Sequence, residues 1–206
     1  FESDFVAEAI SLQIGKNIND ITLDDLELVT EISIWGEHII KSSDEITWES
    51  NPGNYVSSYS VNGKKFSKRG ILDTLEDFSA MKNLHTLQLV KQNITDLSPL
   101  SELNIVHLYL NDNSIADITP LRNMISLYTL ELGGNPVRDF SILSNFTNLG
   151  ELDISDTLCV DISFLRENTG LEMLKARNLK IDSLDFLANL YKLKYLNLEH
   201  NKITDI

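Results

Sequence analysis

LYTLELGGNPV (residues 127–137) sets out a pattern of apolar residues that returns along the chain at a nearly fixed spacing. It has the form L-x-x-L-x-L-x-x-N-x-L. Copies start at Leu84, Ile105, Leu127, Leu149, Leu171 and Leu193, at steps of 21, 22, 22, 22 and 22 residues. A period of this length is typical of solenoid proteins, in which each repeat forms one small structural unit.

The first half of each copy predicts a short strand whose fourth and sixth residues point inward, since side chains alternate along a strand. One repeat cannot bury its apolar side alone, so neighbouring repeats must stack into a parallel sheet over a continuous core. The inward pairs are Leu87/Leu89, Leu108/Leu110, Leu130/Leu132, Leu152/Ile154, Leu174/Ala176 and Leu196/Leu198. Because alanine is smaller than leucine, we expect less apolar packing at position 176 than at the other inward positions.

The second half of each copy predicts a short helical turn, of the 3₁₀ kind, that returns the chain to the next strand. The fifteenth residue always favours a helix N-cap, and proline follows it in two copies. These residues are Ser98, Thr119, Ser141, Ser163 and Asp185, and the prolines are Pro99 and Pro120. We therefore expect an α/β solenoid with short parallel strands on the concave side and 3₁₀ or irregular turns on the convex side.

Three regions are expected: a helical cap at residues 1–28, irregular first repeats at 29–83, and regular 22-residue repeats at 84–206, the last one incomplete. The cap is predicted from a helical apolar face and from a variant capping box at Thr22–Asp25. The apolar face comprises Phe5, Val6, Ala9, Ile10 and Ile14. The first strand is expected around Val29 to Ile34.

Between this strand and Leu84 the spacing fits no 22-residue step, and two interpretations compete. In the favoured one, Val56, Tyr59, Val61 and Phe66 mark two overlong repeats. In the other, Asn62-Gly63 forms a two-residue turn and residues 59–66 make a β-hairpin that projects from the solenoid. Either way, residues 41–54 are expected to form a polar loop carrying an exposed Trp48.

Composition excludes several classes of function. With 17 basic and 31 acidic residues the net charge is -14, which repels nucleic acid and anionic lipid. No apolar run approaches the roughly 18 residues of a membrane span. The only cysteine, Cys159, cannot form an intramolecular disulfide and is expected to be a buried, inert thiol. Neither this cysteine nor the histidines have metal-ligand spacing, so no cofactor is expected.

These repeats resemble the 22-residue leucine-rich repeats of internalin-like bacterial surface proteins, most closely in NITDLSPL (93–100) and NSIADITPL (113–121). The N-terminal cap looks like the one with which such proteins begin. The chain departs from the family in the ninth position of the repeat, where asparagine normally binds the turn backbone. That position holds Gln92, Asn113, Asn135, Thr157, Leu179 and Asn201, so we expect local irregularity in the repeats starting at Leu149 and Leu171.

The resemblance implies a non-enzymatic, protein-binding module of a surface or secreted bacterial protein, located outside the cell. The third, fifth and seventh positions should line the concave face, Ser33, Trp35 and Val90 among them. From this face we select as ligand-binding candidates His107, Tyr109, Glu131, Glu151, Asp153, Lys175, Arg177 and Tyr195. Tyrosines are frequent interface anchors. Glu151 and Asp153 have the spacing of paired catalytic carboxylates, but nothing in the sequence indicates a substrate cleft.

Two other functions stay open: a cytoplasmic regulatory subunit resembling phosphatase-regulator leucine-rich repeat proteins, and a spacer that displays another domain. The sixth copy stops at its fourteenth position. Its apolar border comprises Tyr191, Leu193, Leu196, Leu198 and Ile203. Because solenoids need polar terminal caps, we expect the parent chain to continue beyond Ile206, or else a neighbouring molecule to make an edge-to-edge contact there.

Overall fold

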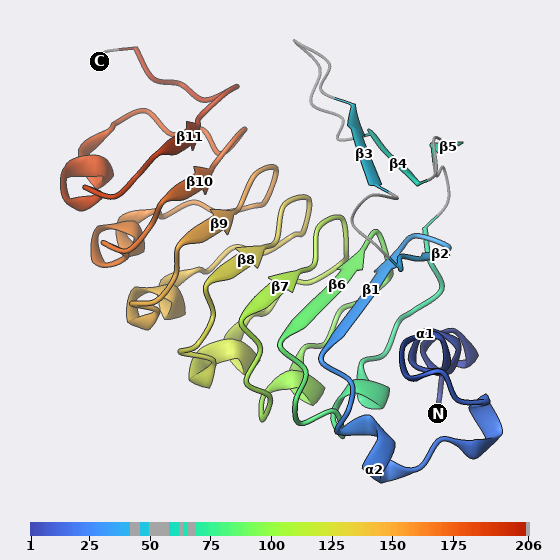
Figure 1. Cartoon of the computed structure of the whole chain (residues 1–206). Coiled ribbons are helices and arrows are strands. Elements are labelled where there is room, and N and C mark those ends of the chain that lie inside the picture. The colour runs from blue at the N-terminus through green and yellow to red at the C-terminus, as the bar shows by residue number, and fades with distance from the viewer. Residues whose placement is uncertain (42–45, 50–57, 62–63, 66–68, 205–206) are drawn as a thin grey trace.

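The computed structural model describes residues 1–41, 46–49, 58–61, 64–65 and 69–204 (Figure 1). The repeats form an eight-stranded sheet in the order β11-β10-β9-β8-β7-β6-β1-β2. Its strands are β1 (Glu31–Trp35), β2 (His38–Ile39), β6 (Thr86–Val90), β7 (His107–Tyr109), β8 (Thr129–Glu131), β9 (Glu151–Asp153), β10 (Met173–Lys175) and β11 (Tyr195–Asn197). Neighbours are parallel, except that β2 is antiparallel to β1. The predicted α/β solenoid is confirmed.

The register of the sheet follows the sequence period. The third residue of each copy pairs with the third residue of the next, so that one line crosses the strands through Thr86, His107, Thr129, Glu151, Met173 and Tyr195. Side chains of equal position therefore lie in columns across the sheet, about 4.8 Å apart. The spacing in the sequence thus fixes which side chains become neighbours.

Short 3₁₀ turns lie on the other side of each repeat: η3 (Glu76–Phe78), η4 (Ser98–Leu100), η5 (Thr119–Asn123), η6 (Ser141–Asn145), η7 (Ser163–Glu167) and η8 (Asp185–Asn189). The predicted N-caps are wrong by one position. Ser98 is the first residue of its turn, and the N-cap is Leu97, which makes no side-chain cap. An aspartate two residues earlier takes over that role, since Asp96 Oδ1 accepts from Ser98 N at 2.8 Å. Asp117, Asp139 and Asp161 repeat this contact.

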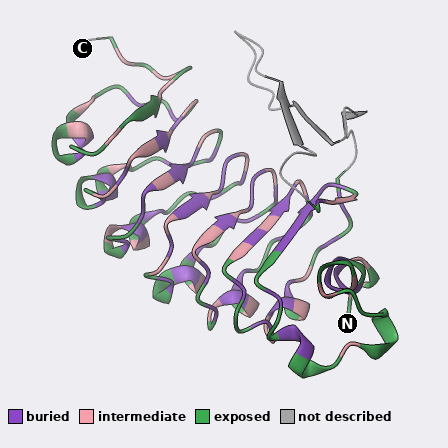
Figure 2. Ribbon diagram, in the orientation of Figure 1, coloured by how far each residue is buried: buried purple, intermediate pink, exposed green. Residues whose placement is uncertain are grey.

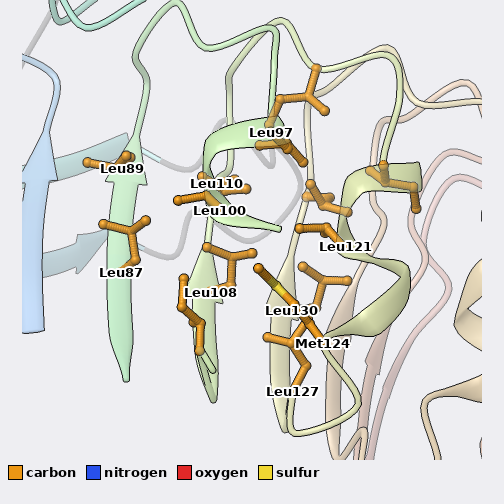
Figure 3. Packing of buried hydrophobic residues seen from close by; sticks show 14 of the residues in the cluster. Leu87, Leu89, Leu97, Leu100, Leu108, Leu110, Leu121, Met124, Leu127 and Leu130 are labelled. Carbon is orange, nitrogen blue, oxygen red and sulfur yellow. The ribbon is translucent and has the colours of Figure 1, made fainter. Parts of the chain in front are cut away.

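The core lies between the strands and the turns (Figures 2 and 3). Inward leucines such as Leu108 and Leu130 are fully buried, and they face turn residues such as Leu121 and Met124. Ala176 is also fully buried. At the β11 edge Leu196 is 37% exposed. Each buried leucine of this kind is worth about 2–5 kcal/mol relative to alanine.

The N-terminal segment folds into α1 (Asp4–Ile14), η1 (Ile18–Asp20) and α2 (Leu23–Leu26). Val6 and Ile10 of α1 are buried in the same core as the strands, while Phe5 and Ile14 are partly buried against it. Asp25 carries the predicted capping box, because its Oδ2 accepts from both N and Oγ1 of Thr22 at 2.8 Å. The helices therefore cover the β1 end of the core.

In each repeat that begins with a parallel strand, the eighth residue, which follows the strand, is left-handed, a feature that was not predicted from the sequence. Positive φ occurs there at Gly36, Lys91, Asp112, Gly134, Asp156, Asn178 and His200. Most of these residue types tolerate that conformation. Lys180, beside Leu179, has a φ of 64° at a different position of its repeat. The predicted irregularity is therefore found in the repeat starting at Leu171.

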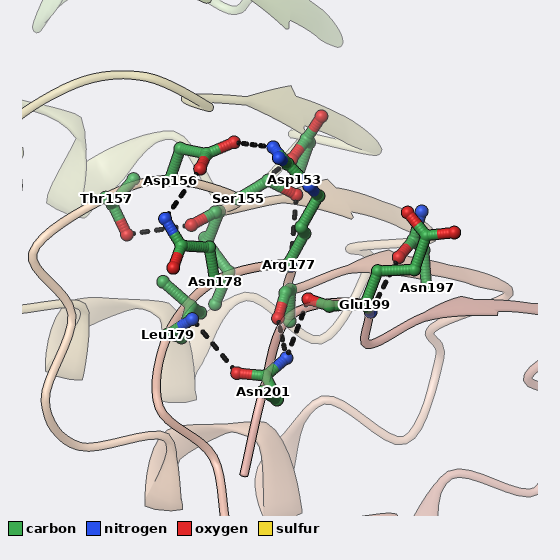
Figure 4. A network of polar contacts seen from close by, with 12 residues as sticks. Asp153, Ser155, Asp156, Thr157, Arg177, Asn178, Leu179, Asn197, Glu199 and Asn201 are labelled. Atoms are coloured by element: carbon green, nitrogen blue, oxygen red, sulfur yellow. Dashed lines mark hydrogen bonds and ion pairs between the residues drawn. The ribbon is translucent and has the colours of Figure 1, made fainter. Parts of the chain in front are cut away.

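The ninth position forms a ladder of side-chain bonds to the backbone. Asn113 Oδ1 accepts from Ile94 N at 3.2 Å, and Nδ2 donates to the carbonyls of Leu89 and Leu110 at 2.7 and 2.9 Å. Asn135 and Asn201 make equivalent bonds, the latter visible in Figure 4. Thr157 donates only to Ile154 O, at 2.7 Å. Leu179 has no polar side chain, so two rungs are weakened or lost.

Residues 37–69 are an insertion within the first repeat. β1 pairs directly with β6, Glu31 facing Thr86, so the chain between them adds no strand to that place in the sheet. Before the insertion, Gly36 N donates a hydrogen bond to Val90 O of the next repeat at 2.8 Å. After the insertion, Gly70 N donates to Lys91 O of the same next repeat at 2.9 Å. The two overlong repeats that we favoured are therefore wrong.

The insertion contributes a second, antiparallel sheet of β3 (Ile46–Glu49), β4 (Ser58–Val61) and β5 (Lys64–Lys65). Val61 pairs with Lys64, as the hairpin interpretation requires. The predicted turn residues Asn62 and Gly63, and Val56 and Phe66, lie outside the described residues, as does the side chain of Trp48. Within the expected polar loop at residues 41–54, residues 46–49 form the strand β3, and residues 42–45 and 50–54 lie outside the described residues.

Candidate functional site on the concave face

The candidate surface lies on the strand side of the solenoid, but its first two strands are already covered. Ile40, just after β2, packs with Trp35 and Val90, which are 3% and 1% exposed. Trp35 Nε1 donates to Gln88 Oε1 at 3.2 Å. Sequence reasoning placed Trp35 and Val90 on an open face because it could not foresee that the insertion would begin by folding back on β1. The accessible part therefore begins at β7.

Tyr109 of β7 borders this apolar cluster and packs partly against it. In the register of the sheet it lies opposite Glu131 of β8. Burial, and then the negative charges of Glu131 and Glu151, raise the pKa of the Tyr109 phenol, so the hydroxyl is neutral at physiological pH. Tyr109 thus presents a partly buried aromatic ring between an apolar patch and two carboxylates.

A chain of hydrogen bonds crosses β7, β8 and β9 beside this tyrosine. His107 Nδ1 lies 3.0 Å from Thr129 Oγ1, and Thr129 Oγ1 donates to Glu151 Oε2 at 3.0 Å. These residues share one line of the sheet register. The ring of His107 also meets that of Tyr128 edge-on, with centroids 6.1 Å apart. The imidazole is therefore held by contacts with two adjacent residues, Tyr128 and Thr129.

A second network is centred on Lys175 of β10. Its Nζ lies 2.9 Å from Glu131 Oε1 and 3.6 Å from Asp153 Oδ2. Glu131 Oε2 also accepts from Asn111 Nδ2 at 2.8 Å. Lys175 therefore bridges two carboxylates of its own column, reaching past Asp153 on β9 to Glu131 on β8. All three charged side chains are largely buried, with 26% of Lys175, 12% of Glu131 and 11% of Asp153 exposed.

Asp153 lies deep in this network. Burial raises the pKa of its carboxyl group, and the charge of Glu131 adds to the effect, while Lys175 and a bond from Ser155 N at 2.9 Å oppose it. Asp153 and Glu151 do not share one proton-transfer geometry, because Glu151 bonds towards β8 and Asp153 towards β10. The arrangement is that of a fixed polar surface.

Arg177 and Tyr195 lie apart from these two networks. Arg177 Nη1 pairs with Asp156 Oδ2 at 2.5 Å, where Asn178 Nδ2 also donates to Asp156 Oδ1 at 2.9 Å (Figure 4). Tyr195 is 43% exposed on β11, and three strands separate it from Tyr109. The structure thus brings together six of the eight candidates, His107, Tyr109, Glu131, Glu151, Asp153 and Lys175.

Thr129 and Asn111 lie in the columns expected to line the concave face, but they were not selected as ligand-binding candidates. Both are buried, at 1% and 6% exposed, and both orient a carboxylate of the concave face. They occupy the third and seventh positions of their repeats, and this column position is the signal that places them on the concave face. Their small, polar side chains gave no other signal.

The other reactive groups considered are Cys159 and the residue types that bind metal ions. Burial raises the pKa of Cys159 to about 11, and its Sγ lies 3.4 Å from Asp161 O, so the nucleophilic thiolate is scarce at neutral pH. Within the described ranges, no group of three or more histidine, cysteine or acidic side chains could hold a metal ion. Nor does any helix in those ranges have the length and apolarity to cross a bilayer.

Parallel strands, 3₁₀ turns and an asparagine ladder repeated every 22 residues define a leucine-rich repeat solenoid. The family model described as "Leucine Rich repeats (2 copies)" matches residues 103–145. The chain thus has a leucine-rich repeat fold, and it shares this fold with two internalins of Listeria monocytogenes.

The first of these, InlF, is 23% identical with a TM-score of 0.57, and the match covers 100% of this chain and 72% of that one. The second, InlC2, is 24% identical with a TM-score of 0.61, covering 96% and 94%. A leucine-rich repeat protein of Leptospira interrogans is 24% identical with a TM-score of 0.58, covering 63% and 34%. No curated protein matches the chain in sequence.

Proposed function

We propose that this chain is a non-catalytic module that binds a protein partner on its concave face. The observation that carries the proposal is the fixed network of Tyr109, Glu131, Asp153 and Lys175, held by bonds between strands. Side chains that are already ordered lose little conformational entropy on binding. Arg177 and Tyr195 would extend the contact towards β11.

The partner would approach β7 to β11, because the concave side of β1 and β6 is occupied by Trp35, Ile40 and Val90. The half-buried Tyr109 is the best anchor, since aromatic residues near the centre of an interface commonly dominate its affinity. Likeness to the internalins favours a surface or secreted bacterial protein over a cytoplasmic regulator.

The test is affinity capture of cell-surface proteins on three immobilised forms of the chain. One is wild type, one carries Tyr109→Ala with Tyr195→Ala, and the control carries Val160→Ser with Glu167→Gln. The control residues line a hollow at η6 and η7, outside the sheet. We expect a partner that binds wild type and the control but is lost from the tyrosine variant.

Equal capture by all three forms would show that the concave face is not the binding surface. Thermal unfolding of each form must be compared first, because loss of the fold would also abolish capture. Protease treatment of intact source cells tests the location: an exported chain is digested, whereas a cytoplasmic regulator is protected.

A further inference from the structure

The chemistry of the partner can be inferred from the protons in the His107–Thr129–Glu151 chain. An ionised carboxylate only accepts hydrogen bonds, so the Thr129 hydroxyl must give its one proton to Glu151 Oε2. Thr129 Oγ1 can then only accept from its other neighbours. The bond to His107 Nδ1 at 3.0 Å therefore requires the proton to be on Nδ1.

The phenol of Tyr109 lies beside this chain, opposite Glu131 in the sheet register, and its oxygen can accept a hydrogen bond. Oε1 of Glu151 is left to accept from a ligand, and the phenol oxygen of Tyr109 has acceptor capacity as well. We call His107, Tyr109, Thr129 and Glu151 the acceptor cluster.

The charge around the acceptor cluster is negative. Glu131 faces Tyr109 in the sheet register, and Asp153 follows on the next strand. Among the described residues, Lys175 is a nearby cation, and it pairs with Glu131 and Asp153. The ring of Tyr109 adds an aromatic surface of the kind that attracts cations. A ligand group that suits this cluster carries a positive charge and several donors.

We propose that the acceptor cluster binds an arginine or lysine side chain of the protein partner, with Glu151 as its ion-pair partner and Tyr109 as its aromatic contact. This inference rests on the proposed function and adds the chemistry of the recognised group. Arginine is favoured over lysine, because its planar guanidinium offers five donors to separately placed acceptors.

The test uses N-acetyl-arginine methylamide as the probe, titrated into the full chain and followed by ¹H–¹⁵N NMR. The neutral, nearly isosteric citrulline analogue is the control ligand, and N-acetyl-lysine methylamide distinguishes the two cationic side chains. We expect the arginine probe to shift the amide signals of residues 107–109, 129–131 and 151–153, and the citrulline analogue to leave them unchanged. Added salt should weaken the shifts.

Two variants sharpen the test. Glu151→Gln keeps the size of the side chain and an acceptor for Thr129, but it removes the charge, so the apparent affinity should fall about tenfold. Glu167→Gln is the matched control, since it removes one exposed carboxylate outside the sheet, and it should leave the affinity unchanged.

Equal shifts with the arginine and citrulline probes, no shifts with either, or unchanged binding by Glu151→Gln would each overturn the inference. The lysine probe binding more tightly than arginine would overturn the preference for guanidinium. If these probes fail while the tyrosine variant still loses its captured protein, the concave binding function stands without this chemistry. If the probes succeed while capture is unaffected, the proposed function fails instead.

Discussion

Gly70 and Gln92 occupy the same position in successive repeats, and the side chain of Gln92 fills the space that a side chain on Gly70 would need. A Cβ atom on Gly70 would lie 1.8 Å from Gln92 Oε1 and 2.3 Å from Gly36 O. Gln92 is fully buried there, accepting from Leu72 N at 3.3 Å and donating to Gly36 O at 2.7 Å. The longer glutamine thus replaces the ladder asparagine where the insertion rejoins the stack.

Gly70→Ala should therefore lower the free energy of unfolding by about 1–3 kcal/mol, the usual cost of overpacking. Urea denaturation measures it. Shortening the neighbour in the double variant Gly70→Ala, Gln92→Asn should recover part of the loss, because only the contact with Gly36 O then remains. A Gly70→Ala variant as stable as wild type would contradict this account of the junction.

The asparagine ladder predicts unequal costs at equivalent positions. Asn113→Ala leaves Ile94 N and the carbonyls of Leu89 and Leu110 without their buried partner, which should cost about 2–4 kcal/mol. Thr157→Ala loses chiefly one bond, to Ile154 O, and should cost about 1 kcal/mol. Urea unfolding of both variants provides the comparison, and equal losses would show that the ladder bonds do not set local stability.

The regular repeats could be predicted from sequence because each feature depends on residues close together in one period. The start at Leu127 placed Leu130 inward, and the structure buries it fully at the expected register. The first repeat could not be predicted in this way. Its closure depends on contacts between distant residues, Gly36 with Val90 and Gly70 with Lys91, that leave no periodic signal.

The candidate site, too, could be predicted from the sequence only in part. Its columns followed from the period, so Tyr109 and Glu131 were correctly expected to lie side by side on neighbouring strands. Which side chains interact did not follow, because Lys175 reaches across β9 to Glu131 and Arg177 turns instead to Asp156. Side-chain length and direction decide these pairings, and neither is encoded in the spacing of leucines.

Acid should weaken the N-terminal cap through Asp25. Its bond to Lys16 Nζ at 2.5 Å, with the bonds from Thr22, lowers its pKa from 3.8 to about 2. The unfolded chain takes up this proton more readily, so the stabilisation is present above pH 4 and is lost as the pH falls towards 2. We expect Asp25→Asn to melt below wild type at pH 7, with the gap closing in acid. Asp24→Asn, on the exposed neighbour, should show no such gap.

The effect of pH on stability through Asp153 should be opposite to the effect through Asp25. Burial raises its pKa above the ordinary value of 3.8, so the folded chain binds this proton more tightly than the unfolded chain does. Its contribution to stability therefore declines as the pH rises from about 4 through the folded pKa, and an ionised Asp153 lowers the stability at neutral pH. Asp153→Asn keeps an acceptor for Ser155 N but titrates no proton. Its melting temperature relative to wild type should thus rise between pH 4 and pH 7. A difference that stays constant, or that favours wild type increasingly as the pH rises, would mean that the ion pair with Lys175 outweighs the effect of burial.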